Sequence, residues 1–419
     1  MNGAAVADRT EPQPRGGQRS RTDELKAWLT APASVVPLRV WIVTRLMFAV
    51  LTYFGVILFN SVLHGAHPSF THSFLSAWHN PISHGGWDTN WYLQIAERGY
   101  HWKNPAGTTP AAFFPLYPFL IHVGTAVTHH SSLLIALLIS NLSFLAALGY
   151  LYRLTVWELG KQTAARVVLY IAIFPTALFF FAGYSESLFL VLTVACFYHM
   201  RRRQWLLAGF FGGLASATRV TGVLLFVPYV YEYGRACNFR PREMLRGFGV
   251  PGALLIPLGL AGFMLYLQRA VGDPIAFSHG QEAWQKILTL KLWAGFAETV
   301  RQVVSVQPPA SFYEAHNLIN GGIGLIFLIA SVLAARRLPA SYSLYVAAFW
   351  VVTLASPAMA GGYPVPLISL SRYVLTLFPV FMYFGLLGRR RDAHDAYVVL
   401  SAGLLSLFTV QFLIGGWIV

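Results

Sequence analysis

Residues 36–63 read VPLRVWIVTRLMFAVLTYFGVILFNSVL, a continuous apolar run in which Arg39 and Arg45 are the only charged residues. About 20 such residues suffice to cross the roughly 30 Å hydrocarbon core of a bilayer. The run therefore predicts a transmembrane helix. The basic segment before it places the N-terminus in the cytoplasm, so Arg39 and Arg45 lie toward its inner end.

The rest of the chain has the same character. Of its 419 residues, 56% are hydrophobic and 11% are charged, whereas soluble domains carry roughly 25% charged residues. The mean hydropathy of +0.55 agrees. These values predict an all-α polytopic membrane protein and exclude a soluble enzyme. The two cysteines, Cys196 and Cys237, form no metal or redox motif.

The formal net charge is +14, which in a soluble protein would suggest a nucleic-acid partner. Here the cations cluster between apolar runs, as the preference of Lys and Arg for cytoplasmic loops predicts. We therefore expect no nucleic acid among the partners. The strongest clusters, predicted to be cytoplasmic, are at residues 201–203, 235–246, 336–337 and 389–391.

The order of apolar runs and basic clusters predicts the topology. Residues 1–34 are polar, basic and rich in Pro and Gly, which is typical of a disordered tail, and residues 35–419 form the membrane domain. Residues 64–131 form a large first extracytoplasmic loop that ends in an interfacial helix near 113–127. We expect roughly eleven spans (ten to twelve) in all. The later runs are 132–152, 165–183, 187–200, 204–234 (a hairpin of two short helices), 248–268, 317–335, 340–356, 372–388 and 396–418.

The longest polar interruption, residues 85–118, reads GGWDTNWYLQIAERGYHWKNPAGTTPAAFFPLYP. It places Asp88 between Trp87 and Trp91, with Tyr92 following. A carboxylate suits the general base that takes a proton from an acceptor hydroxyl during sugar transfer, and the three aromatic side chains could stack on sugar rings. The alternative is an ordinary interfacial belt of tryptophans with Asp88 as a turn residue.

Four further residues are candidates for substrate binding. Tyr184 and Glu186 lie between two apolar runs, where capping of the next helix is the alternative role. Arg219 lies deep in apolar sequence and needs an anionic partner, either a lipid phosphate or Glu186. Arg372 begins a span and is a second phosphate candidate, with snorkelling to the interface as the alternative.

The remaining ionisable residues argue against an ion-coupled transporter and against a metal site. None of the acidic residues lies at the centre of an apolar span, which argues against an ion-coupled transporter. Glu97 belongs to the outward-facing carboxylates. The six histidines of the first loop match no metal-site spacing, so we predict no metal, and a divalent ion held by Asp88 and some of them stays an alternative. They are His64, His67, His72, His79, His84 and His101.

Five segments resemble, in order and spacing, the GPI mannosyltransferase II (PIG-V) family and its bacterial relatives. The resemblance runs through most of the membrane region, and residues 269–316 and the tail carry no match. The segments are WDTNWYLQIAERGY (87–100), AFFPLYP (112–118), IFPTALFFFAGYSESLFLVL (173–192), ATRVTG (217–222) and SRYVLTLFP (371–379).

The resemblance implies a glycosyltransferase of the GT-C class, a bundle of membrane helices that takes its sugar, typically mannose, from a polyprenyl phosphate on the non-cytoplasmic side. The implied mechanism is a single inverting displacement. Asp88 is the implied catalytic residue, and Arg219 and Arg372 meet the charge of the departing phosphate. Glu97 and Glu186 orient the acceptor or hold those arginines.

The acceptor stays open. Arginine outnumbers lysine by 25 to 5, which favours a bacterial source and the plasma membrane, and there a lipid, a glycan or a protein hydroxyl are all acceptors to consider. Three other functions also stay open. They are transfer of another lipid-linked sugar such as arabinose or glucose, transport or flipping of a lipid-linked saccharide, and a non-catalytic role in a glycosylation complex.

Overall fold

The computed structural model describes residues 32–64, 75, 77–78, 88–101, 109–281, 290–305, 312–360, 363–416 and 418. Residues 1–31 of the predicted tail, Trp87 and the histidines 67, 72, 79 and 84 lie outside these ranges. The end of the tail was predicted wrongly, because residues 32–34 form the first turn of α2 (Pro32–His64). Proline is favoured at that position, where a helix needs no N–H donor.

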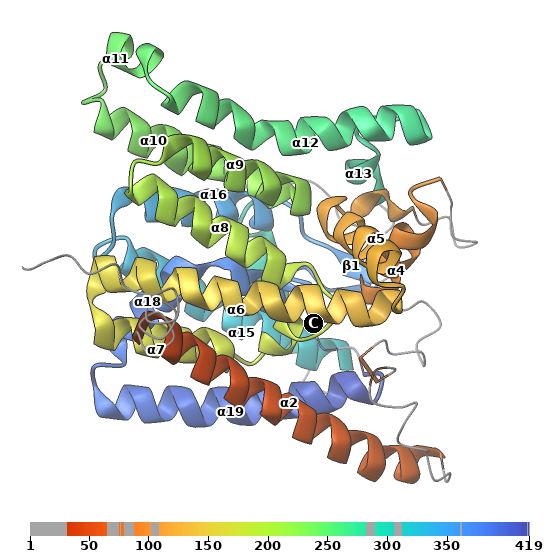
Figure 1. Ribbon diagram of the computed structural model, residues 1–419. Coiled ribbons are helices and arrows are strands. Elements are labelled where there is room, and N and C mark those ends of the chain that lie inside the picture. The colour runs from red at the N-terminus through yellow and green to blue at the C-terminus, as the bar shows by residue number, and fades with distance from the viewer. Residues whose placement is uncertain are drawn as a thin grey trace, which may run out of the picture.

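The described chain is almost entirely helical, which confirms the predicted all-α class (Figure 1). The one strand pair among the described residues, β1 (Met359–Ala360) with β2 (Tyr363–Pro364), is antiparallel with Met359 opposite Pro364. In chain order the α-helices and 3-10 helices (η) after α2 are α4 (Asp88–Arg98), η1 (Pro110–Ala112), α5 (Leu116–Thr128), α6 (Ser132–Leu159), α7 (Lys161–Ala172), η2 (Ala177–Phe180), α8 (Glu186–Arg201), α9 (Trp205–Thr218), η3 (Val220–Leu225), α10 (Phe226–Ala236), α11 (Pro241–Arg246), α12 (Gly249–Val271), α13 (Ala276–His279), α14 (Ala294–Ser305), α15 (Phe312–Ala334), α16 (Ala340–Leu354), α17 (Leu370–Tyr373), η5 (Val374–Thr376), α18 (Phe378–Leu387) and α19 (Arg391–Leu413).

Within the described residues, five helices are long and apolar enough to cross a membrane, which supports an integral membrane protein. A sixth candidate is the segment from α17 to α18, which bends by 84°. The predicted count of about eleven spans is not confirmed. Several predicted spans are short helices, such as α8 with 16 residues, whose length of about 24 Å falls short of the hydrocarbon core.

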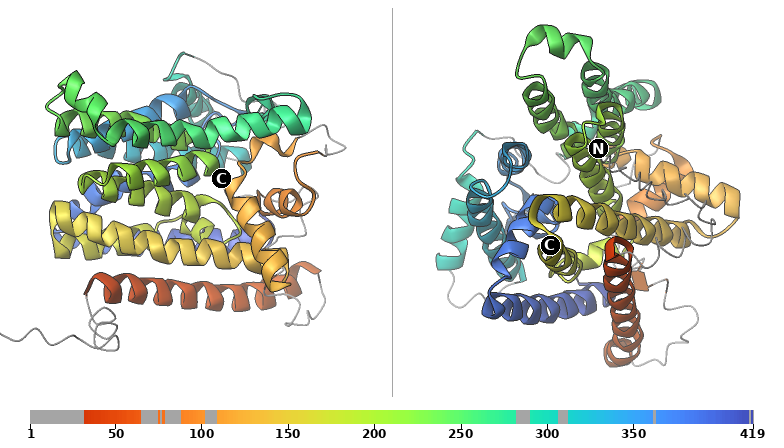
Figure 2. Two further views of the ribbon diagram at one scale, coloured as in Figure 1. Left: turned by 45° about the horizontal axis from the view of Figure 1, so that its top comes forward. Right: turned by 60° about the vertical axis from the view of Figure 1, so that its left-hand side comes forward.

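The long helices lie side by side (Figure 2). Hydrophobic side chains, many of them aromatic, form a buried core. In that core Phe144 of α6 stacks on Phe180 of η2 at 4.4 Å between ring centroids. Helices α9 and α12 approach most closely at glycines: a Cβ on Gly209 would lie 2.0 Å from the carbonyl oxygen of Gly252. Small residues allow such close backbone packing in membrane helices.

The predicted hairpin within residues 204–234 is present as α9, a break at Arg219, and η3 continuing into α10. Arg219 has extended backbone angles and ends α9. A Cβ on Gly222 would lie 2.3 Å from the backbone of Ala215, so the returning chain lies directly against α9. Arg219 therefore lies at the break between the two helices and not within a regular helical turn.

The helix predicted to begin at Phe113 begins instead at Leu116, directly after Pro115. Tyr117 and Ile121 on one side of α5 are buried, while Phe119 and Val127 on the other side are exposed. This apolar outer surface agrees with the predicted interfacial position, which stays a prediction. Figure 1 places α4, α5 and α13 at one end of the long helices and α11 at the other end.

Candidate active site

Asp88 is the first residue of α4, where a negative charge is favoured by the unpaired N–H groups of a helix start. The next turn is fixed by burial of Trp91 and Tyr92. Trp91 stacks on Phe113 with ring centroids 5.4 Å apart, and the edge of Tyr92 packs against Tyr117 at 4.9 Å. The start of α4 is therefore held by aromatic packing on α5 and on the segment just before it.

An ionic cluster joins Asp88 to three of the other predicted residues. Arg372 Nη1 donates to Asp88 Oδ2 at 2.6 Å, and Arg219 Nη1 donates to Glu186 Oε1 at 2.6 Å. Arg372 Nε lies 3.3 Å from the same Glu186 oxygen, an ion-pair contact whose angles do not meet those of a hydrogen bond. Side chains from α4, α8, α17 and the end of α9 thus form one chain of alternating charge.

Burial differs along this cluster. The exposed fraction of the side chain is 1% for Glu186, 12% for Arg372, 20% for Arg219 and 22% for Asp88. Glu186 is therefore the inner member that holds both arginines, and Asp88 is the most accessible one. With two carboxylates and two guanidinium groups the cluster is formally neutral, which limits the cost of burying its charges.

Aromatic rings surround the two arginines. The Arg372 guanidinium lies 5.4 Å from the centre of Phe179, 5.5 Å from Tyr184 and 5.3 Å from Tyr373. Arg219 lies 5.4 Å from the ring of Tyr373. Such cation–π contacts favour a guanidinium over the ring face, so Tyr184 shapes the arginine position through its ring.

Hydrogen bonds connect Tyr92 and Tyr184 to the same region. The Tyr92 hydroxyl pairs with Ser185 Oγ at 2.8 Å, and Ser140 Oγ donates to the Tyr184 carbonyl at 2.9 Å. Burial, reinforced by the nearby Glu186 carboxylate, raises the pKa of the Tyr92 phenol above its ordinary value. The phenol therefore stays protonated and available as a hydrogen-bond donor at neutral pH.

Glu97 lies outside the cluster. It is exposed near the other end of α4, and Ser132 Oγ at the start of α6 donates to its Oε1 at 3.0 Å. Nine residues of α-helix separate it from Asp88 by roughly 13 Å. Of the two carboxylates expected to hold the arginines, only Glu186 contacts them.

Three residues that the sequence did not indicate fix the segment carrying Arg372. Ser371 donates from both its backbone N–H and its hydroxyl to Asn320 Oδ1, at 3.0 and 2.8 Å. Thr176 Oγ1 donates to the Ser371 carbonyl at 2.7 Å. The one available signal was the polar Asn320 within the apolar sequence of α15.

Metal ligands do not gather at this site: within the described ranges no group of three or more His, Cys, Asp or Glu side chains could hold an ion. Four of the six histidines of the first loop are outside those ranges, so the metal alternative is not tested by these residues.

Comparisons with known proteins show which family this chain resembles. The model of the family described as Mannosyltransferase (PIG-V) matches residues 36–237, just under half of the chain. The chain is 31% identical over 185 residues to GPI alpha-1,6-mannosyltransferase 2 of Mus musculus, covering 41% of this chain and 34% of the mouse protein. It is 28% identical over 166 residues to GPI mannosyltransferase 2 of Yarrowia lipolytica, covering 39% and 44%. The matched stretch thus spans less than half the length of these curated relatives.

Solved structures resemble the chain more distantly. ArnT from Cupriavidus metallidurans, bound to undecaprenyl phosphate, is 13% identical with a TM-score of 0.47, covering 84% of this chain and 62% of that chain. The Archaeoglobus fulgidus oligosaccharyltransferase in complex with zinc and sulfate is 13% identical with a TM-score of 0.43, covering 88% and 52%. Both scores lie below 0.5, and no role is assigned from them.

The family match contains Asp88, Glu186 and Arg219 of the cluster, whereas Arg372 lies beyond it. The resemblance to the PIG-V mannosyltransferases that the sequence motifs predicted is therefore confirmed over residues 36–237.

Proposed function

We propose that this chain is a membrane mannosyltransferase that moves mannose from a polyprenyl-phosphate donor to a hydroxyl of a lipid or glycan acceptor. The observation that carries the proposal is the ionic cluster. Asp88, Glu186, Arg219 and Arg372 come from four segments that resemble the family motifs, and the fold brings each charged group within 2.6 to 3.3 Å of an oppositely charged neighbour.

In the proposed reaction Asp88 is the general base. Its carboxylate takes the proton of the acceptor hydroxyl while the hydroxyl oxygen forms a bond to the anomeric carbon of mannose. The bond between that carbon and the phosphate oxygen breaks, and the polyprenyl phosphate leaves with the electron pair. Attack opposite to the leaving group inverts the anomeric configuration. Asp88 is the most exposed carboxylate of the cluster, as a base that must reach a substrate requires.

Arg372 and Arg219 would stabilise the leaving group, because the phosphate gains one negative charge as the bond breaks. A guanidinium carries five N–H donors in a planar fork that suits phosphate. The contact of Arg219 to Glu186 uses Nη1 alone. Arg372 bridges Asp88 and Glu186, so a phosphate that draws Arg372 toward itself would also free the Asp88 carboxylate for the acceptor proton.

Two buried polar atoms support the binding of a substrate at the cluster. Glu186 Oε2 and Arg372 Nε are buried and form no hydrogen bond within the described part of the chain. Unsatisfied buried polar groups are costly. A sugar or acceptor hydroxyl, which can both donate and accept, would satisfy both atoms.

The proposed site faces the non-cytoplasmic side. Residues 201–203, one of the strongest predicted cytoplasmic clusters, lie at the end of α8, whereas Glu186 begins the same helix. The basic segment α11 also lies at the end of the bundle opposite to α4 (Figure 1). The preference of Lys and Arg for cytoplasmic loops supports this orientation.

Transfer from a labelled donor tests the proposed activity. Membranes that contain the chain, supplied with radiolabelled polyprenyl-phosphate mannose and a lipid extract, are expected to form a labelled mannosylated product. Polyprenyl-phosphate glucose and arabinose, tested in parallel, should give little product. If glucose or arabinose were transferred faster than mannose, that sugar would be the proposed donor sugar instead. Movement of labelled donor across vesicles without a covalent product would favour the transporter alternative instead.

Gly183 provides a test of how Asp88 is positioned. A Cβ on Gly183 would lie 2.9 Å from the Cγ2 methyl of Thr89, the fully buried neighbour of Asp88. Gly183→Ala is therefore expected to displace the start of α4 and slow transfer by about 100-fold, the cost of a misplacement of roughly 1 Å. Adding Thr89→Ser removes that methyl and should restore most of the rate. A double variant as slow as Gly183→Ala would show that the methyl contact does not position Asp88.

A further inference from the structure

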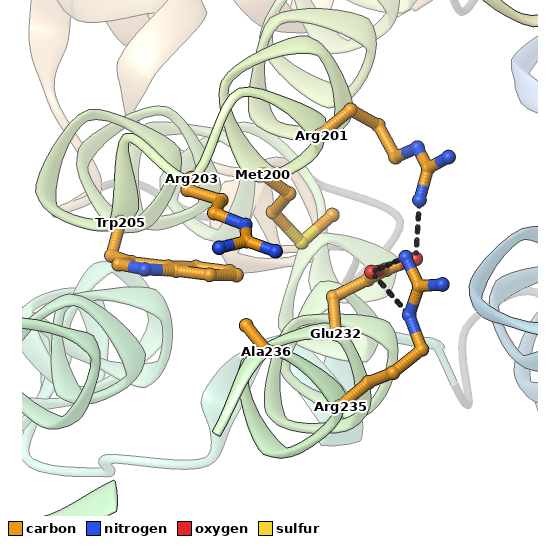
Figure 3. Close-up of a pocket in the computed structure, with 7 residues that line it drawn as sticks. All are labelled: Met200, Arg201, Arg203, Trp205, Glu232, Arg235 and Ala236. Atoms are coloured by element: carbon orange, nitrogen blue, oxygen red, sulfur yellow. Dashed lines mark hydrogen bonds and ion pairs between the residues drawn. The ribbon is translucent and has the colours of Figure 1, made fainter. Parts of the chain in front are cut away.

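A second polar site lies at the opposite end of α8 from the ionic cluster. A pocket of about 140 Å³ opens where α8 and α10 end and α9 begins, lined mainly by Met200, Arg201, Arg203, Trp205, Glu232 and Arg235 (Figure 3). The 16 residues of α8 separate it from Glu186 by about 24 Å. We propose that this pocket binds the phosphate of an anionic phospholipid, a function separate from sugar transfer.

Two of the three arginines are neutralised by buried carboxylates. Arg201 donates to Glu158 Oε1 at 2.6 Å and to Glu232 Oε1 at 3.1 Å. Arg235 donates to Glu232 Oε2 at 2.8 Å, and Ser341 Oγ donates to Glu232 Oε1 at 2.7 Å. Both oxygens of Glu232 are therefore occupied, and this network has no negative charge left for a third cation.

Arg203 is that third cation. Its side chain has no hydrogen-bond or ion-pair partner among the residues that the structure describes. In Figure 3 its guanidinium lies beside the Trp205 ring and Met200, and no dashed line joins it to the paired groups at Glu232. The pocket is thus lined by one exposed arginine that is not paired with a carboxylate of the described chain and lies beside an aromatic ring.

The start of α9 adds to this positive character. Its N-cap residue, Gln204, makes no side-chain capping hydrogen bond to the first N–H groups of the helix. These N–H groups give the start of the 14-residue helix, which lies at the pocket, a partial positive charge. Arg201 and Arg235 lie in the last turns of α8 and α10, where a cation is favoured. Arg203 and the start of α9 together therefore favour an anion.

Apolar surface next to the pocket favours a lipid over a free anion. Leu206 and Phe210, four residues apart on α9, are 43% and 51% exposed, which places them on one outer side of the helix. Trp157 on α6, next to Glu158, is 64% exposed, as is common for tryptophan at the level of the lipid headgroups. A phosphate in the pocket would leave its acyl chains against Leu206 and Phe210. Basic pockets at helix ends bind anionic headgroups in this way.

The test compares two neighbouring arginines in the full-length chain, purified in mild detergent. Arg203→Asn removes the unpaired cation, and asparagine suits the left-handed backbone found at this position, where φ is 58°. Arg202→Asn is the matched control: both arginines are exposed, but Arg202 is not among the residues that line the pocket and donates to the Tyr198 hydroxyl instead. The two variants change the net charge equally. The readouts are the thermal midpoint with added lipid and the phosphatidylglycerol retained on the protein by native mass spectrometry.

We expect phosphatidylglycerol to raise the midpoint of the wild type, while phosphatidylcholine and inorganic phosphate leave it unchanged. Arg203→Asn should retain phosphatidylglycerol about tenfold less well, the loss of one charge-assisted hydrogen bond, and Arg202→Asn should behave as wild type. If both variants lost the same amount of bound phosphatidylglycerol, the cause would be the general surface charge rather than the pocket, and the proposal would be wrong. An equal response to inorganic phosphate would identify a free-anion site, and an equal response to phosphatidylcholine would remove the preference for anionic lipid.

Discussion

Asp88→Asn is expected to lower the rate of sugar transfer by about 10²- to 10⁴-fold, the usual contribution of a positioned general base. Asparagine has nearly the same shape and can still accept the hydrogen bond of Arg372, but its amide cannot take a proton from the acceptor. The 22% exposed Asp88 side chain lies at the rim of the cluster, so the variant should keep its fold. Transfer is measured with labelled polyprenyl-phosphate mannose at equal amounts of purified protein.

Glu97→Gln is the matched control for this prediction. It makes the same change from carboxylate to amide on the same helix, but Glu97 is exposed and bonds only Ser132 in the described chain. Its transfer rate should stay within about twofold of wild type, as for surface substitutions away from a site. If Glu97→Gln were the slower variant, the base would lie at the other end of α4. If Asp88→Asn kept the wild-type rate, Asp88 would have only a structural role.

The sequence was sufficient to identify the four charged residues of the cluster as candidates, but not to predict that Asp88 contacts Arg372. Asp88 and Arg372 lie 284 positions apart yet pair at 2.6 Å. Asp88 was singled out as a carboxylate among aromatic residues in a polar loop, and Arg372 as a charged side chain at the start of an apolar span, where it needs an anionic partner. The same reasoning offered Glu186 as the partner of Arg219, and the structure contains that pair.

Other features depend on contacts that local sequence does not specify. Asn320 binds Ser371 across 51 positions, and nothing in either segment identifies the other. Glu97 looked equivalent to Glu186 because both are carboxylates near the predicted outer surface, and only helix geometry separates them. The count of spans was not confirmed because apolar runs such as 165–183 continue through breaks: α7 ends at Ala172 and the chain then forms η2. Hydropathy reports that such a run is apolar, but it does not show where a helix ends within it.

Glu186→Ala is expected to have the largest effect on stability. Glu186 is 1% exposed and holds both Arg219 and Arg372, so its removal leaves two largely buried cations with Asp88 as the remaining carboxylate of the cluster. Breaking a buried ion pair by removing one partner costs about 3–5 kcal/mol. The loss is measured as the change in free energy of unfolding by denaturant titration in mixed micelles.

Glu243→Ala tests whether burial causes this loss. Glu243 also pairs with an arginine, Arg240 at 3.0 Å, but the two side chains are 50% and 69% exposed. Exposed pairs contribute less than about 1 kcal/mol, so this variant should unfold almost as the wild type does. Adding Arg219→Met to Glu186→Ala removes one stranded cation and should recover part of the stability, because the cost comes from the unpaired charge rather than from the lost contact. A double variant less stable than Glu186→Ala would instead show that Arg219 stabilises the fold through its contact with Tyr373.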